Sequence, residues 1–173
     1  MDVNLFFLIL RVIHILGGVF WVGAAFLLAG FIGPAVQATA PEGGKVMQHL
    51  LARTRYNQAM AWASSLTVLT GLLLLKRVSG GFQGPWMASG TGMVLTVSGA
   101  LGVVAYLHSL FTIARSNARM AQIARAVQAS AGPPTEAQWD ELGALQAKAA
   151  RNGRITALML LLVVIGMAAA RVV

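Results

Sequence analysis

The sequence has no cysteine, only five acidic residues and few charges of either sign, since charged residues make up 10% of its 173 positions. Without cysteine the chain cannot form disulfides, thiolate-held zinc sites or iron–sulfur clusters. Soluble domains normally carry about 25% charged residues, so the scarcity of charge excludes an ordinary soluble domain. Hydrophobic residues reach 57% instead, and this composition indicates a membrane protein.

The apolar residues gather in four runs that match membrane helices. The predicted spans are residues 5–32, 59–75, 92–113 and 155–170. They predict an all-α fold, an integral membrane four-helix bundle in one domain over residues 1–173. We expect Gly33-Pro34 to end the first helix, because proline disfavours a helix interior. A helix that starts at Lys45 is expected to continue directly into the second span.

The basic residues are divided unevenly between the two ends of these spans. Nine lie in the first and third loops and three on the opposite side: Lys45, Arg53, Arg55, Arg115, Arg119, Arg125, Lys148, Arg151 and Arg154, against Lys76, Arg77 and Arg171. The positive-inside rule then predicts that both termini of this multi-pass protein lie outside. We expect the membrane to be the cell inner membrane. The net charge of +8 is interpreted as topology signals and contacts with the lipid bilayer, and not as nucleic-acid binding.

The third loop, at about residues 114–151, is long enough to form its own structure. Gly132-Pro133-Pro134 interrupts it, and Thr135 with Gln138 three residues later matches a capping box. The loop is therefore predicted to be a cytoplasmic hairpin of two helices, broken at the glycine and prolines.

The first span carries two ionisable residues, Arg11 and His14. Charged or titratable groups within a membrane are costly, so they indicate a functional site. At 100° per residue, Gly18 and Trp21 fall within about 40° of His14, and Arg11 lies about 60° to one side of it. This face combines a base, an indole and a small residue. Arg11 is expected to reach the interface, to anchor lipid or to bind an acidic group such as a haem propionate, and Trp21 either packs or stacks on a ring.

His14 has two interpretations. As a neutral side chain it would hydrogen-bond to Ser65, Thr67 or Thr96 across the bundle. As a functional group it would bind a metal or haem iron, or handle protons.

His108, in the third span, lies at a different depth from His14. A rise of about 1.5 Å per residue gives a separation of about 9 Å along the membrane normal, so one haem iron is not expected to take both as ligands. His108 is either an interfacial histidine or a ligand of its own site. Met159 is expected close to the level of His108 and Met167 close to that of His14, and both are alternatives for a haem or copper ligand or simple packing residues.

The pattern His14-x6-Trp21-x-Gly23, followed by Pro34, resembles the first span of a group of four-helix bacterial membrane proteins. The group includes copper-resistance D-type proteins, HemJ-type protoporphyrinogen oxidases and related uncharacterised membrane families. The segment of residues 70–77 and the break before the fourth span also resemble that group. The resemblance implies haem b held by His14. The HemJ-type lysine has no match within residues 87–92, so the implied function is porphyrin binding and not protoporphyrinogen oxidation.

These observations predict a haem b-binding, cytochrome b-like or redox-associated membrane protein. The alternatives are a copper-handling membrane protein and a non-catalytic accessory subunit of a larger membrane complex. A redox or membrane-protein partner, or a second copy of the chain, is the expected protein contact.

Overall fold

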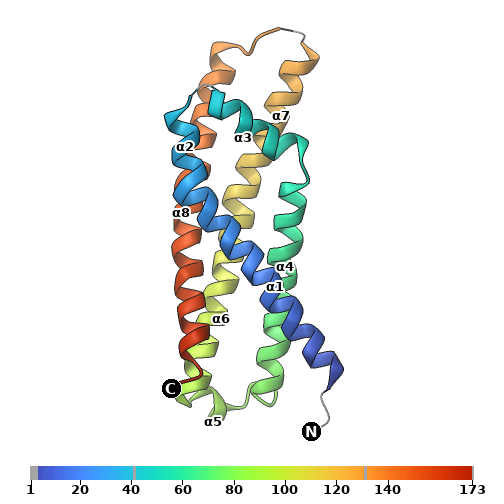
Figure 1. The fold of residues 1–173 in the computed structure, drawn as a ribbon, viewed down its shortest axis with the longest axis vertical. Helices are drawn as coiled ribbons and strands as arrows, with labels where there is room; N and C mark the ends of the chain where they lie inside the picture. The colour runs from blue at the N-terminus through green and yellow to red at the C-terminus, as the bar shows by residue number, and fades with distance from the viewer. Residues whose placement is uncertain (1–3, 41, 131, 173) are drawn as a thin grey trace.

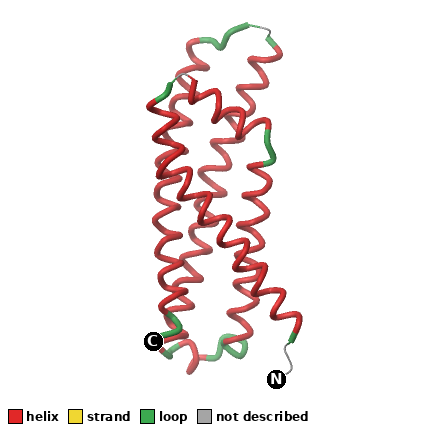
Figure 2. The backbone as a smooth tube through the Cα atoms, in the orientation of Figure 1, coloured by secondary structure: helices red, strands yellow, loops and turns green. Residues whose placement is uncertain are grey.

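The computed structural model describes residues 4–40, 42–130 and 132–172, and among these it contains helices and no strand (Figures 1 and 2). Four helical stretches are long and apolar enough to cross a membrane: Leu5–Ala38, Tyr56–Val78, Gly90–Ala129 and Glu136–Ala169. Each predicted span falls on one of them. The protein is an all-α membrane four-helix bundle, as the sequence predicts.

The first long stretch joins α1, Leu5–Leu27, to α2, Gly33–Ala38, through a π-helical segment, Leu28–Ile32. The prediction that Gly33-Pro34 ends the helix is wrong. The N–H of Gly33 donates to the carbonyl of Leu28, five residues earlier. This wider turn admits Pro34, which has no N–H and whose ring would clash with the carbonyl one ordinary turn back.

The helix before the second span, α3, runs over Glu42–Arg53 and ends before α4, Tyr56–Val78. The prediction of one continuous helix is therefore wrong as well. The hydroxyl of Thr54 accepts the Tyr56 N–H at 3.1 Å, and the side-chain amide of Asn57 donates to the Leu51 carbonyl at 2.8 Å. At the break, these side chains thus replace the backbone hydrogen bonds that a continuous helix would provide, as threonine and asparagine often do at helix ends.

The second half of the chain forms two long helical stretches, of 40 and 34 residues. A short helix, α5, Gly84–Met87, precedes α6, Gly90–His108, which continues through a π-helical segment, Ser109–Ala114, into α7, Arg115–Ala129. The last helix, α8, covers Glu136–Ala169 without a break.

The end of the molecule opposite α5 is formed by α7 and the beginning of α8 (Figure 1). The two helices of the predicted hairpin and the break between them are confirmed. So is the capping box, in which Thr135 and Gln138 each accept a backbone N–H of the other, at 3.3 and 2.9 Å. The carboxylate of Glu141 on α8 accepts two hydrogen bonds from the Arg119 guanidinium on α7, at 2.6 and 3.0 Å.

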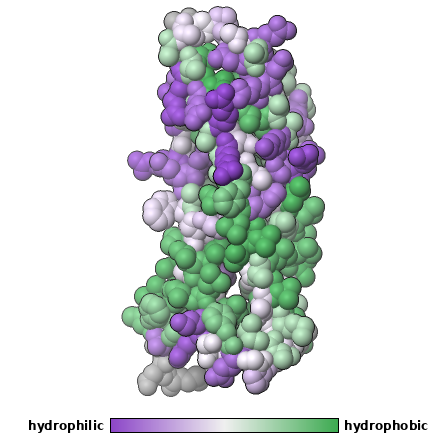
Figure 3. Space-filling model, turned by 180° about the vertical axis from the view of Figure 1, so that it is seen from behind, coloured by the Kyte–Doolittle hydropathy of each residue, from purple (hydrophilic) through white to green (hydrophobic). Residues whose placement is uncertain are grey.

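The interior of the bundle is small. Trp21 on α1, Ala105 on α6 and Leu160 on α8 form its buried core, with Met60 and Val68 of α4 packed against it. Large apolar side chains on each of the long helices face outward instead, among them Leu16, Leu69, Val97 and Leu162. Figure 3 shows apolar surface over the half that carries the termini and hydrophilic surface over the opposite end. This distribution fits contact with a lipid bilayer around the apolar half.

Candidate functional site

The site around His14 starts from the crossing of α1 and α4, the pair of helices that packs most extensively. Gly17 makes the close approach possible. A Cβ atom added there would lie 2.5 Å from the Thr67 hydroxyl oxygen and 3.2 Å from the Ala63 carbonyl oxygen. Membrane helices associate largely through van der Waals packing of such small residues. The crossing therefore requires glycine at position 17.

His14 lies on α1 one turn before Gly17, toward the N-terminus, and its ring lies against Gly71 of α4. A Cβ atom on Gly71 would lie 2.8 Å from Cε1 of the imidazole. The Nδ1 atom of His14 lies 2.8 Å from the main-chain oxygen of Thr67. Its contacts with Thr67 and Gly71 place His14 level with Leu69, midway between them. Thr67 is one of the three predicted partners, although the contact is with its carbonyl and not with its hydroxyl.

This hydrogen bond assigns the proton on the ring of His14. A carbonyl oxygen only accepts, so Nδ1 is the donor, and in the neutral imidazole the lone pair is on Nε2. The one hydrogen bond of the His14 ring to the described residues is made by Nδ1. Histidines that bind metals usually donate their other ring N–H to a carbonyl or carboxylate, which fixes the tautomer and the ring orientation. This arrangement leaves Nε2 as the ring nitrogen of His14 that could bind a metal ion.

Trp21 lies deeper in the bundle and is 4% exposed. Its ring packs edge-to-face on Tyr106 of α6, with ring centroids 6.4 Å apart. The hydroxyl of Tyr106 lies 3.0 Å from that of Ser65 on α4. Of its two predicted roles, the structure shows packing, because Trp21 belongs to the buried core with Ala105 and Leu160.

Arg11, also on α1, is exposed and lies three residues before His14. No carboxylate among the described residues forms an ion pair with it. It is available to an acidic group near His14.

His108 ends α6, directly before the π-helical segment. Its Nε2 atom is buried and has no hydrogen-bond partner among the described residues. The next residue, Ser109, lies 3.3 Å from the hydroxyl of Thr156 on α8. His108 is thus half-buried within the bundle, with an unsatisfied nitrogen, and not simply exposed at the interface.

The contacts with α4 give the depth of His108 relative to His14. His14 is level with Leu69, and Tyr106 is level with Ser65 through their hydrogen bond. Four residues of α4 correspond to about 6 Å, and the two residues from Tyr106 to His108 add about 3 Å. The resulting offset is about 9 Å. One metal ion would hold two histidine nitrogens only about twice a metal–nitrogen distance of roughly 2 Å apart, so the two histidines are too far apart to share one ion.

The two methionines can be placed in the same way. Thr156 contacts Ser109, the residue that follows His108. Met159 therefore lies about 3 Å from the level of His108, toward the end of the bundle that carries the termini. Met167 lies about 12 Å further along α8, toward the end of the bundle that carries the termini. It is therefore about 6 Å nearer to that end than His14 is. Both are half-buried, and Met159 packs against the core. Among the described residues no group of three histidine, aspartate or glutamate side chains is placed to hold a metal ion.

Sequence reasoning identified His14 but not the groups that orient it. The Thr67 carbonyl gives no sequence signal, because every residue has one, and Gly71 is one of 19 glycines. The chain matches no protein-family model, no curated protein and no solved structure in searches of each.

Proposed function

We propose that this membrane protein binds haem b, which Nε2 of His14 would hold through its iron, and takes part in electron transfer. The observation that carries the proposal is the hydrogen bond from Nδ1 of His14 to the Thr67 carbonyl, because it leaves the lone pair on Nε2. A bound haem b supplies one-electron redox chemistry.

The remaining contributions come from the residues around His14. The Thr67 carbonyl holds the ring in one tautomer, and the absence of a side chain at Gly71 leaves room for that ring. Arg11 is exposed and unpaired among the described residues, one turn outward, where its charge would bind a propionate. Trp21 packs on Tyr106 in the buried core of the bundle.

The test is the visible absorption spectrum of the full-length protein, purified in detergent from haem-sufficient cells. We expect a Soret band in the wild type and its loss in His14→Ala. His49→Ala is the matched control, because His49 is exposed on α3, and it should keep the band. Size-exclusion chromatography and circular dichroism show whether each variant is folded. A folded wild type without haem, or a folded His14→Ala with full haem occupancy, would contradict the proposal.

A copper-handling role would need a second ligand near His14. The offsets estimated for Met159 and Met167, about 6 Å inward and outward of His14, do not favour one. Metal analysis of the same preparations separates the alternatives, since copper without a Soret band would support a copper-handling protein. Absence of both would leave the role of an accessory subunit.

For the location we propose the cell inner membrane, with both termini outside. The uneven division of basic residues supports this orientation, because the end that carries α3, α7 and the start of α8 holds most of them. A reporter fused after Val173 should be active only outside the cytoplasm. Cytoplasmic activity would reverse the orientation.

A further inference from the structure

A groove of about 420 Å³ opens between the beginning of α1 and the end of α4. The groove lies between the crossing at Gly17 and the end of the bundle that carries the N-terminus. Figure 1 shows α1 running diagonally across the bundle, so that its first turns diverge from α4. Two helices held together at one point and inclined to each other leave a wedge between their ends. The wedge is open to the side, where lipid would surround the apolar half of the bundle.

The walls of the groove are apolar. Phe6, Phe7 and Leu10 of α1 face Leu73 of α4. Phe6 and Leu73 are exposed, so in a membrane these walls contact whatever fills the groove. Their position within two apolar spans fits a hydrocarbon chain.

The outer end of the groove is cationic. Lys76 and Arg77 line it in the last turn of α4. The guanidinium carbon of Arg77 lies 4.6 Å from the centroid of the Phe7 ring, a cation–π contact that limits its motion. A turn with positive φ angles at Gly80 and Gly81 closes the groove without adding side chains.

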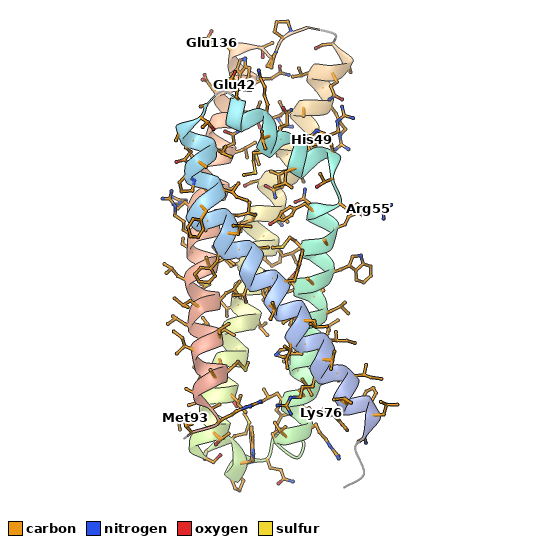
Figure 4. The ribbon with its side chains drawn as sticks, viewed as in Figure 1. Glu42, His49, Arg55, Lys76, Met93 and Glu136 are labelled. Atoms are coloured by element: carbon orange, nitrogen blue, oxygen red, sulfur yellow. The ribbon has the colours of Figure 1, made fainter. Side chains whose placement is uncertain are left out.

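These two cations have no ion-pair partner among the described residues. Four of the five acidic residues lie in α3 and at the start of α8: Glu42, Glu136, Asp140 and Glu141. Figure 4 shows Lys76 at the end of the molecule opposite Glu42 and Glu136. The fifth, Asp2, is outside the described residues. The described part of the groove therefore presents two positive charges above an apolar floor.

We propose that this groove is a binding site for one anionic phospholipid. Its phosphate lies between Lys76 and Arg77, at the depth where α4 ends, and one acyl chain follows Phe6, Leu10 and Leu73 inward. Both parts of the lining are then used. A small soluble anion would leave the apolar walls unoccupied, and the amine of a zwitterionic lipid would be repelled by the two cations. The proposal does not depend on haem at His14.

The test measures lipid binding by native mass spectrometry after exchange in nanodiscs of phosphatidylcholine, with and without phosphatidylglycerol. We expect the wild type to retain one phosphatidylglycerol. The double variant Lys76→Gln/Arg77→Gln should bind it about 30-fold more weakly, from the usual effect of two basic residues at a lipid surface. Arg53→Gln/Arg55→Gln removes the same charge from the other end and should change affinity less than twofold.

A second variant tests the apolar part. Leu73→Trp fills the groove at an exposed position and should displace the lipid while both charges remain. Unchanged binding in Leu73→Trp or in Lys76→Gln/Arg77→Gln would overturn the proposal.

Two further measurements separate the occupants. Displacement of the lipid by millimolar inorganic phosphate would show a site for anions alone and would also overturn the proposal. His14→Ala, expected to lack haem, should keep the lipid. Loss of the lipid from folded His14→Ala would show that lipid binding depends on the His14 site and would overturn the proposal of an independent groove site, whereas retention leaves the lipid site standing even if no haem is found.

Discussion

His14 and His108 lie in the same apolar bundle, but only His14 has a hydrogen-bond partner on a facing helix among the described residues. His14 donates to the Thr67 carbonyl and lies against Gly71, whereas Nε2 of His108 is buried without a partner among the described residues. A buried unsatisfied polar group costs about 1–3 kcal/mol. The comparison indicates that a histidine in a membrane helix is accommodated by the facing helix, through a carbonyl within reach and a missing side chain.

The largest effect is expected at the crossing that brings His14 to α4. Gly17→Ala places a methyl group against the Thr67 hydroxyl and the Ala63 carbonyl and should destabilise the protein by about 1–3 kcal/mol, as overpacking usually does. Gly18→Ala is the control, because its Cβ would lie an ordinary 3.7 Å from Thr67. Unfolding in bicelles by steric trapping measures both. Equal stability of the two variants would show that the crossing is not close-packed.

Replacing each histidine by leucine should shift stability in opposite directions. His14→Leu loses the hydrogen bond to Thr67 and should destabilise the haem-free protein by about 1 kcal/mol. His108→Leu removes the unsatisfied nitrogen and should stabilise it by about 1 kcal/mol. The same steric-trapping assay applies. Destabilisation by His108→Leu would show that Nε2 of His108 has a partner, such as an internal water or a ligand. The two histidines would then not differ in whether they are hydrogen-bonded.

The smallest effect concerns a polar pair outside the membrane-spanning segments, where water competes for both partners. The side-chain hydrogen bond from Arg119 holds the pKa of Glu141 below its usual range and, reciprocally, raises the pKa of Arg119. Because the pKa of Glu141 is lowered on folding, its contribution is present above the unfolded-state pKa and is lost as pH falls through the folded-state pKa.

The protection of amides in residues 115–150 against hydrogen exchange, corrected for the intrinsic pH dependence of exchange, should therefore fall locally as the solution is acidified through that range. Glu141→Gln should exchange faster at neutral pH and lose this part of the pH dependence. An unchanged pH dependence in Glu141→Gln would show that the pair does not hold α7 to α8.

Most of the fold follows from local patterns in the sequence. Apolar runs define the spans, and the Thr135–Gln138 capping box and the prolines before it define the hairpin. Predictions failed where the backbone departed from ordinary helix rules. Pro34 was absorbed by a π-helical turn, and side chains of Thr54 and Asn57 supported a break that hydropathy does not register.

Less of the site could be predicted, because it depends on contacts between helices. The rise per residue was enough to separate His14 from His108 by about 9 Å, and the same offset follows from the contacts with α4. It could not show that His14 meets a main-chain carbonyl, nor that α1 inclines away from α4 and opens a groove beside Lys76. Those features depend on where two helices cross.

The most direct test of the central claim is the tautomer of His14, measured by nitrogen-15 NMR of histidine-labelled protein in nanodiscs, with His14 assigned through His14→Gln. In the haem-free protein we predict a proton on Nδ1 and none on Nε2. Addition of haem should then shift or broaden the Nε2 signal of His14 and leave those of exposed His49 unchanged. A proton on Nε2 of His14, or a signal indifferent to haem, would contradict the account.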